Sequence, residues 1–216
     1  MDALQKLKEF VLQQTSIIDE PGKLLYSSAK TLRPYPIYFL GTKPGGTLPT
    51  TIRQSLDDLE TDKNEYLDYS WEKRPPGEAK LQKQVRRYLG GLGFDVRDVP
   101  ASNIVFTRAK STGEHPDLDG HAKLSWLIHL RILEIVKPDN ILVFGSGQDM
   151  SPFSYLKEFL CPKDIEARDA GQKPFTCYRF KTAINNKETG VIAVPHLTRY
   201  SPYKHPEIME WVKEWL

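Results

Sequence analysis

Residues that could do chemistry follow directly after three apolar runs of the sequence. Each run is short and unbroken. The residues that follow are GTKPG (41–45) after the run 35–40, GSG (145–147) after 141–144, and PHLT (195–198) after 191–194. A lysine such as Lys43 can bind a phosphate as a point charge, and a histidine such as His196 can donate a hydrogen bond where negative charge develops. These turns are therefore the candidates for a functional site.

The segments between the apolar runs have helical periodicity, and the alternation predicts an α/β fold. Shorter helices are expected after Thr50 and Thr51 and from Ser151 onward, where Pro152 occupies a favoured first-turn position. Residues 57–77 are charged and rich in proline near their end, so they are expected to form a long surface loop. The longer helices are expected at residues 2–19, 78–92, 122–136 and 206–215, and the strands at 35–40, 103–106, 141–144, 175–180 and 191–194, the last two as a hairpin.

Short apolar strands that alternate with helices indicate a mainly parallel sheet that is covered on both faces. Ligands of such sheets bind beyond the carboxyl ends of the strands. We therefore expect Gly41, Asn103, Gly145 and His196 to converge on one cleft at one edge of the sheet. The length of 216 residues fits a single domain, 1–216, that includes the N-terminal helix.

The composition predicts a soluble, cytoplasmic protein. Charged residues make up 27% of the chain and the net charge is +2, which excludes a uniformly basic nucleic-acid coat but leaves room for a local basic groove. No apolar run is long enough to span a membrane, and the first residues do not resemble a signal peptide. No metal or cofactor is expected, because the histidines and the two cysteines show no metal-ligand spacing and residues 145–147 lack the third glycine of a dinucleotide-binding motif.

The order of these features resembles the uracil-DNA glycosylase superfamily. GTKPGG (41–46) is similar to its first motif, and VPHLTRYSP (194–202) is similar to its last motif. ASNIVFTRA (101–109), with the segment 121–147, resembles the strand that carries a base-reading asparagine and the helix and strand that follow. The resemblance covers residues 35–201. It implies a three-layer α/β/α fold with a mainly parallel, four-stranded central sheet.

The resemblance also implies roles for individual residues, because such enzymes flip a base out of the duplex and hydrolyse its N-glycosidic bond. His196 would donate a hydrogen bond to the leaving base, and Asn103 would pair with the edge of a uracil-like base. Tyr200 would be the exposed side chain that wedges into the gap in the duplex. The base pocket would also be lined by Gly41, Thr42, Pro44 and Gly45, and DNA phosphates would be contacted by Thr198, Arg199, Ser201 and Lys204.

The first motif departs from the family pattern at Thr42 and Lys43, where active members usually carry an aspartate, an asparagine or a nearby glutamate. Three roles are open to Lys43: it could point to solvent, bind a phosphate, or attack an abasic sugar as an amine nucleophile. A substitute carboxylate could come from the following helix and loop, which also carry two aromatic residues that could stack on a base, Tyr69 and Trp71. The candidate carboxylates are Asp57, Asp58, Glu65 and Asp68.

Three functions remain open from the sequence. The chain could be a DNA glycosylase that acts on uracil or a related base, and DNA would then be its partner. It could be a catalytically silent member that binds nucleic acid. It could instead bind or hydrolyse free nucleotides or small phosphorylated molecules, with Lys43 and the glycine turns as an anion cradle.

Overall fold

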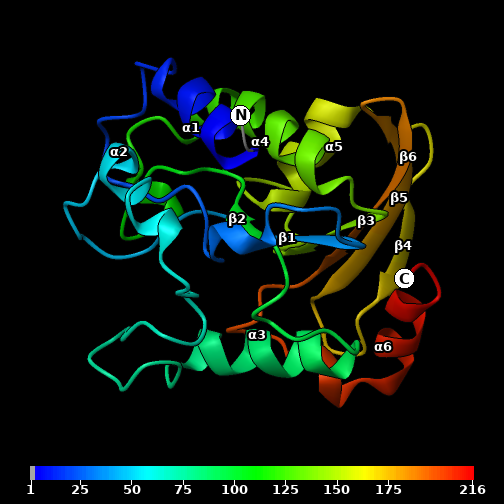
Figure 1. Cartoon of the computed structure of the whole chain (residues 1–216). Helices are drawn as coiled ribbons and strands as arrows, with labels where there is room; N and C mark the ends of the chain where they lie inside the picture. The colour runs from blue at the N-terminus through cyan, green and yellow to red at the C-terminus, as the bar shows by residue number, and fades with distance from the viewer. Residues whose placement is uncertain (1–2) are drawn as a thin grey trace.

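The computed structural model describes residues 3–216 and has an α/β fold, in which helices lie on both faces of one six-stranded sheet (Figure 1). The strand order is β2-β1-β3-β6-β5-β4. The strands are β1 (Ile37–Gly41), β2 (Ala101–Asn103), β3 (Asn140–Phe144), β4 (Glu166–Asp169), β5 (Thr176–Ile184) and β6 (Lys187–Val194). The helices are α1 (Ala3–Leu12), α2 (Ile52–Ser55), α3 (Lys80–Gly91), α4 (Leu118–Val136), α5 (Pro152–Leu160) and α6 (Pro206–Lys213).

The sheet is larger than the four-stranded sheet that the resemblance implied. Strands β2, β1, β3 and β6 run parallel, whereas β5 pairs antiparallel with β6 and β4 pairs antiparallel with β5. Strand β4 was missed because its residues are polar and largely exposed at the edge of the sheet. The predicted hairpin is present: Asn185 and Asn186 both have positive φ angles of 49° and 62°, which suits a tight two-residue turn.

The two faces of the sheet carry two separate hydrophobic cores. Tyr38 and Leu40 of β1 face the core that also contains the buried sides of α1, α4 and α5. Ile37 and Phe39 face the other core, which contains the buried sides of α3 and α6. This alternation follows from the two-residue period of a strand, and it determines which strand-end residues can reach one another.

Several predicted boundaries are wrong. The first helix ends at Leu12 rather than at residue 19, and the buried Ile17 and Ile18 lie in turns beyond it, while residues 1–2 of the prediction fall outside the described part. The second strand is Ala101–Asn103 rather than 103–106, because residues 104–106 leave the sheet and pack beside the turn after β1.

The segment 57–77 is not a purely exposed loop. Asn64, Glu65 and Tyr66 are buried within it. The Asn64 side chain accepts a hydrogen bond from the Tyr66 amide (2.8 Å) and donates one to the Val96 carbonyl (3.0 Å), and these bonds hold the segment against the domain. In the part of the chain that the structure describes, no helix is long and apolar enough to cross a membrane.

Candidate functional site at the ends of the parallel strands

The carboxyl ends of the parallel strands place four residues in a row on one face of the sheet. Gly41 is paired with Asn103 across β1 and β2, and Phe144 is paired with Val194 across β3 and β6. A Cβ atom on Gly41 would collide with the Asn103 side-chain oxygen and would lie 2.6 Å from the Phe144 ring. The rings of Phe144 and His196 meet edge to face, with centroids 5.4 Å apart. Gly41, Asn103 and His196 therefore lie at the same edge of the sheet. The expectation that they share one cleft with Gly145 is met only by Gly145 and His196, because Gly41 and Asn103 do not line the cleft described next.

An open cleft of about 480 Å³ lies beside His196, between the turn after β3 and the turn after β6. Gly145 has a φ angle of 135°, a conformation that side-chain-bearing residues rarely adopt. Ser151 caps α5 at the same side of the cleft. The lining combines polar and apolar groups. The polar lining residues include Thr42, Ser146, Gln148, Ser151, Thr176, His196, Thr198 and Arg199, and the apolar ones include Met150, Pro174, Phe175 and Pro195.

His196 is held as a neutral hydrogen-bond donor. The amide N–H of Thr198 donates to His196 Nδ1 at 3.3 Å, and the Thr198 hydroxyl lies 2.8 Å from the same atom. Burial, together with the neighbouring Arg199 charge, lowers the pKa of His196 to about 4. Since Nδ1 accepts from the backbone, the single ring hydrogen is on Nε2. A neutral imidazole of this kind can donate a hydrogen bond to a developing anion.

Asn103 is fixed by its backbone, and its side-chain amide group is buried. Its side chain is buried at 4% exposure, and its Nδ2 atom has no hydrogen-bond partner among the described residues. The backbone carbonyl oxygen of Asn103 accepts a hydrogen bond from His129 Nε2 (3.0 Å), and the Tyr38 hydroxyl lies 3.0 Å from His129 Nδ1. Burial lowers the pKa of His129 to about 4, so this ring is also neutral. A buried donor without a partner is costly, and such groups often await a ligand or a water.

Hydrogen bonds connect the turn at residues 41–45 to the segment that follows β2. The amides of Ile104 and Val105 donate to the carbonyls of Gly41 (2.9 Å) and Thr42 (3.0 Å). Further along the turn, the Pro44 carbonyl accepts from the amide of Ala109 (3.4 Å) and the Gly45 carbonyl from the side chain of Arg108. These carbonyls are thus engaged within the protein. Of the turn residues, Thr42 lines the cleft.

Lys43 does not extend into solvent. Its amine donates to the carbonyl oxygens of Ala109 and Pro44, so the side chain ties the turn to the neighbouring segment. Burial lowers the pKa of the amine and the Arg108 charge lowers it further, while Glu114 raises it. The solvent-pointing role is therefore wrong. The phosphate-binding and nucleophilic roles stay predictions, and each would require this amine to leave its carbonyl partners.

Tyr200 is not the exposed wedge that the resemblance implied. Its side chain is 1% exposed, its hydroxyl donates to the Ala170 carbonyl (2.6 Å), and its ring stacks on His205. The packing of residues 200–205 against α6 and the β4–β5 connection accounts for this burial. Tyr200 therefore packs inside the protein and stabilises the loop that carries Thr198 and Arg199.

The other predicted phosphate contacts are divided between two places. Thr198 and Arg199 line the cleft together with His196. Ser201 donates instead to Gln84 of α3 (3.3 Å), and Lys204 is exposed in the short helical turn Pro202–Lys204.

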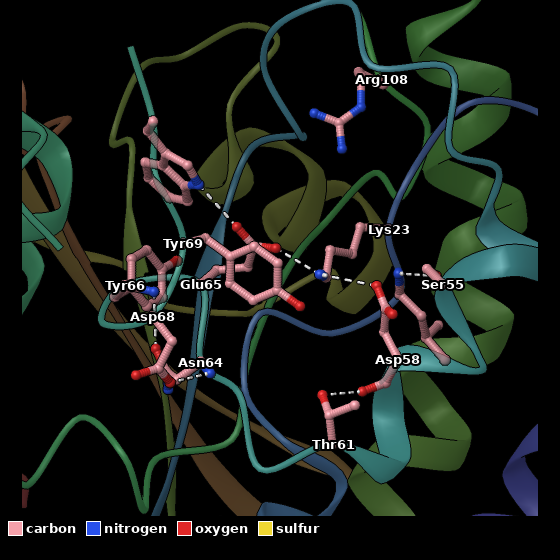
Figure 2. A network of polar contacts seen from close by, with 12 residues as sticks. Lys23, Ser55, Asp58, Thr61, Asn64, Glu65, Tyr66, Asp68, Tyr69 and Arg108 are labelled. Atoms are coloured by element: carbon pink, nitrogen blue, oxygen red, sulfur yellow. Dashed lines mark hydrogen bonds and ion pairs between the residues drawn. The ribbon is translucent and has the colours of Figure 1, made fainter. Parts of the chain in front are cut away.

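A second polar cluster joins Lys23 to residues of the segment 57–77 (Figure 2). The Lys23 amine contacts the Glu65 carboxylate at 2.5 Å and lies over the Tyr69 ring, 4.4 Å from its centroid. The Trp71 indole donates to the other Glu65 oxygen at 2.8 Å. Of the four acidic candidates in this region, Glu65 is the buried one, a distinction that the sequence pattern did not make.

Metal ligation is not supported by the side chains that the structure describes. Among residues 3–216, no group of three or more histidine, cysteine, aspartate or glutamate residues is placed to hold a metal ion.

Comparison with known proteins gives no family: no protein-family model matches the chain, and no curated protein sequence matches it. The function is therefore inferred from the site itself.

Proposed function

We propose that this chain is a DNA glycosylase-like protein that binds uracil or a related damaged base and excises it by cleaving the N-glycosidic bond. The observation that carries the proposal is the placement of two complementary groups on either side of Gly41. His196 offers a neutral N–H donor, and Asn103 offers a buried amide without a partner. One base could be contacted by both, which is what recognition of a flipped base requires.

The arrangement of the elements supports the same proposal. Helices on both faces of a sheet with four parallel strands agree with the three-layer α/β/α fold of the uracil-DNA glycosylase superfamily. The glycine at position 41 leaves room for the Asn103 side chain, and the hydroxyl-lined cleft with Arg199 suits the phosphates that flank a base. DNA is the partner that this proposal implies.

The test is excision from defined oligonucleotides. Duplexes and single strands that each carry one altered base are incubated with the protein, and abasic sites are then revealed by alkaline cleavage. We expect cleavage at uracil or a related damaged base, and no cleavage in undamaged DNA. If no base is excised but one altered duplex is bound above the undamaged control, the chain is a silent binder, and the catalytic part of the proposal is wrong.

A second candidate function is favoured by the cleft alone. Its hydroxyl lining, Arg199 and the capped start of α5 would also suit a free nucleotide or another small phosphorylated molecule. Titration with nucleoside phosphates separates the two functions. A DNA duplex is then added as a competitor of the bound nucleotide at increasing salt concentrations. If nucleic acid is the ligand, the duplex should compete less well as the salt concentration increases, because counterion release makes duplex binding steeply salt-dependent.

A further inference from the structure

Helix α3 carries four basic residues and no acidic residue. The basic residues are Lys80, Lys83, Arg86 and Arg87. The buried side chains of the helix belong to the core on that face of the sheet, so the basic residues lie toward its outward side. Figure 1 shows α3 as an outer element of the fold, on the face of the sheet opposite α1 and α4. A charged outward side can simply be solvated, so charge alone does not indicate a partner.

Part of this outward side forms a stripe along the helix. Lys80, Gln84 and Arg87 recur at intervals of four and three residues, so they share one side of the helix. At a rise of about 1.5 Å per residue, the stripe is about 10 Å long. The phosphates of one DNA strand are spaced about 3.4 Å apart along the duplex axis, so the stripe matches about three of them.

The stripe continues into the loop that lines the cleft. The Ser201 hydroxyl donates to the Gln84 side chain (3.3 Å), and Arg87 donates to the Tyr203 hydroxyl (3.2 Å) with its guanidinium 5.6 Å from the centre of that ring. Burial raises the pKa of the Tyr203 hydroxyl, but hydrogen bonds from Ser201, Arg87 and Gln84 outweigh burial and lower the pKa. Arg199 lines the cleft only two residues before Ser201, so their Cα atoms are at most about 7.6 Å apart. A polar track therefore leads from the cleft to α3.

Positive charge is concentrated along this track. Residues 78–91 and 195–205 together contain six basic residues and one acidic residue, a net charge of +5, whereas the whole chain carries +2 and the other residues therefore carry −3. The one acidic residue, Glu78, pairs with Lys83 (2.6 Å) and Arg86 (3.6 Å). In the part of the chain that the structure describes, no carboxylate lies within 4 Å of the charged groups of four exposed residues of the track, Lys80, Arg87, Arg199 and Lys204. These four charges are not neutralised by the protein itself.

Gly90 lies on the same side of α3, three residues beyond Arg87. It is exposed, and a Cβ atom at this position would meet no atom of a neighbouring segment within 4 Å. Glycine destabilises a helix relative to alanine, so neither packing nor the helix itself explains its presence. A missing side chain does allow the backbone of a partner to approach closely. Gly90 is thus a second observation, independent of charge, that points to a bound partner.

We propose that the outward side of α3 and the short helical turn Pro202–Lys204 bind the phosphate backbone of the DNA that flanks the altered base. This inference rests on the proposed function for the position of the base, and it adds a binding surface outside the cleft. Lys80, Arg87 and Lys204 donate to phosphate oxygens, and Gly90 lets the strand approach the helix. The regular spacing of the stripe and its continuity with the cleft favour a nucleic-acid strand over an acidic protein.

The test is the salt dependence of binding to an undamaged DNA duplex, followed by fluorescence anisotropy. The triple variant Lys80→Gln, Arg87→Gln, Lys204→Gln removes three of the unpaired charges. We expect it to reduce the slope of log binding constant against log salt concentration by about 2 to 3, because each lost phosphate contact contributes about 0.9.

Further variants separate a binding surface from a general effect of charge or of stability. The matched control Lys6→Gln, Lys123→Gln, Arg131→Gln removes three exposed cations of α1 and α4, on the opposite face of the sheet, and should keep the wild-type slope. Gly90→Glu adds a negative charge and favours the helix, because glutamate is a better helix former than glycine. It should lower duplex affinity, and Gly90→Gln should lower it less. Thermal unfolding identifies any variant that has lost its fold, and if the triple variant unfolds, Gly90→Glu carries the test.

The outcomes keep this inference apart from the function on which it rests. If the wild type binds the undamaged duplex through these residues but neither prefers nor excises an altered base, the surface stands and the proposed function fails. If an altered base is excised but the triple variant keeps the wild-type slope, the proposed function stands and the surface is wrong. A poly-glutamate peptide that binds through the same residues, with no binding of duplex, would replace DNA by an acidic protein and overturn the proposal.

Discussion

At the scale of single residues, the site combines two neutral hydrogen-bonding groups with different tasks. The N–H group of His196 is oriented by the backbone of Thr198, and the Asn103 amide is oriented by the strand on which it lies. A donor that meets developing charge contributes to the rate, whereas an amide that pairs with a base edge contributes to the choice of base. The two residues should therefore respond differently to substitution.

We expect His196→Ala to lower single-turnover excision by about 10²–10³-fold, the usual loss when one charge-stabilising donor is removed. Asn103→Ala should instead relax the choice among altered bases, because it removes the edge-reading amide. Both are measured on the same panel of oligonucleotides. Ser201→Ala is a control, since that hydroxyl bonds Gln84 rather than lining the cleft. Equal and small effects of the first two substitutions would favour a silent binder.

At the scale of elements, a buried histidine joins three of them. His129 of α4 contacts the Tyr38 hydroxyl of β1 and donates to the Asn103 carbonyl at the end of β2. This connection sets the position of the Asn103 backbone from the opposite face of the sheet. It also makes the fold sensitive to acid, because the interior of the protein provides no place for a charged imidazole.

The free energy of unfolding should fall as pH falls from about 6.5 to about 4. The pKa of His129 is about 4 in the folded protein and that of an unperturbed histidine is about 6.5, so the unfolded state binds more protons in this window. One such group contributes up to about 1.4 kcal/mol per pH unit. Urea unfolding between pH 4.5 and 7.5 measures the slope. His129→Gln should reduce it, and an unchanged slope would contradict the neutral, buried state of the ring.

At the scale of the whole molecule, the net charge of +2 predicts a modest, local attraction to DNA. Arg199 lines the cleft and is exposed, so it is the cation best placed to meet a phosphate there. Some of the other surface cations are paired with acidic neighbours. Lys213 with Glu210 and Lys181 with Glu188 are examples.

We expect Arg199→Gln to reduce the slope of log binding constant against log salt concentration by about 1, because one phosphate contact and its counterion are lost. The measurement is duplex affinity by fluorescence anisotropy over a range of salt concentrations. Lys213→Gln, at the end of α6 and paired with Glu210, should leave the slope unchanged. A slope that neither substitution alters would place the DNA contact away from the cleft.

The sequence by itself determined the α/β class, most of the elements and the edge of the sheet where the candidate residues meet. These follow from local rules. A two-residue period, a glycine turn and a capping residue such as Ser151 act over a few positions, so they can be recognised in the chain. The sequence pattern therefore predicted that Gly41, Asn103 and His196 lie at one edge of the sheet, but it did not predict that only His196 of the three lines the cleft, and the number of strands and several boundaries were wrong.

Only the tertiary structure decided where individual side chains point. Tyr200 is buried by contacts with Ala170 and His205, Lys43 is turned back by the carbonyl of Ala109, and Glu65 is drawn inward by Lys23 and Trp71. Most of these partners lie tens of residues away in the chain. No local pattern specifies such contacts, because the direction of a polar side chain depends on which distant groups packing brings within hydrogen-bond reach.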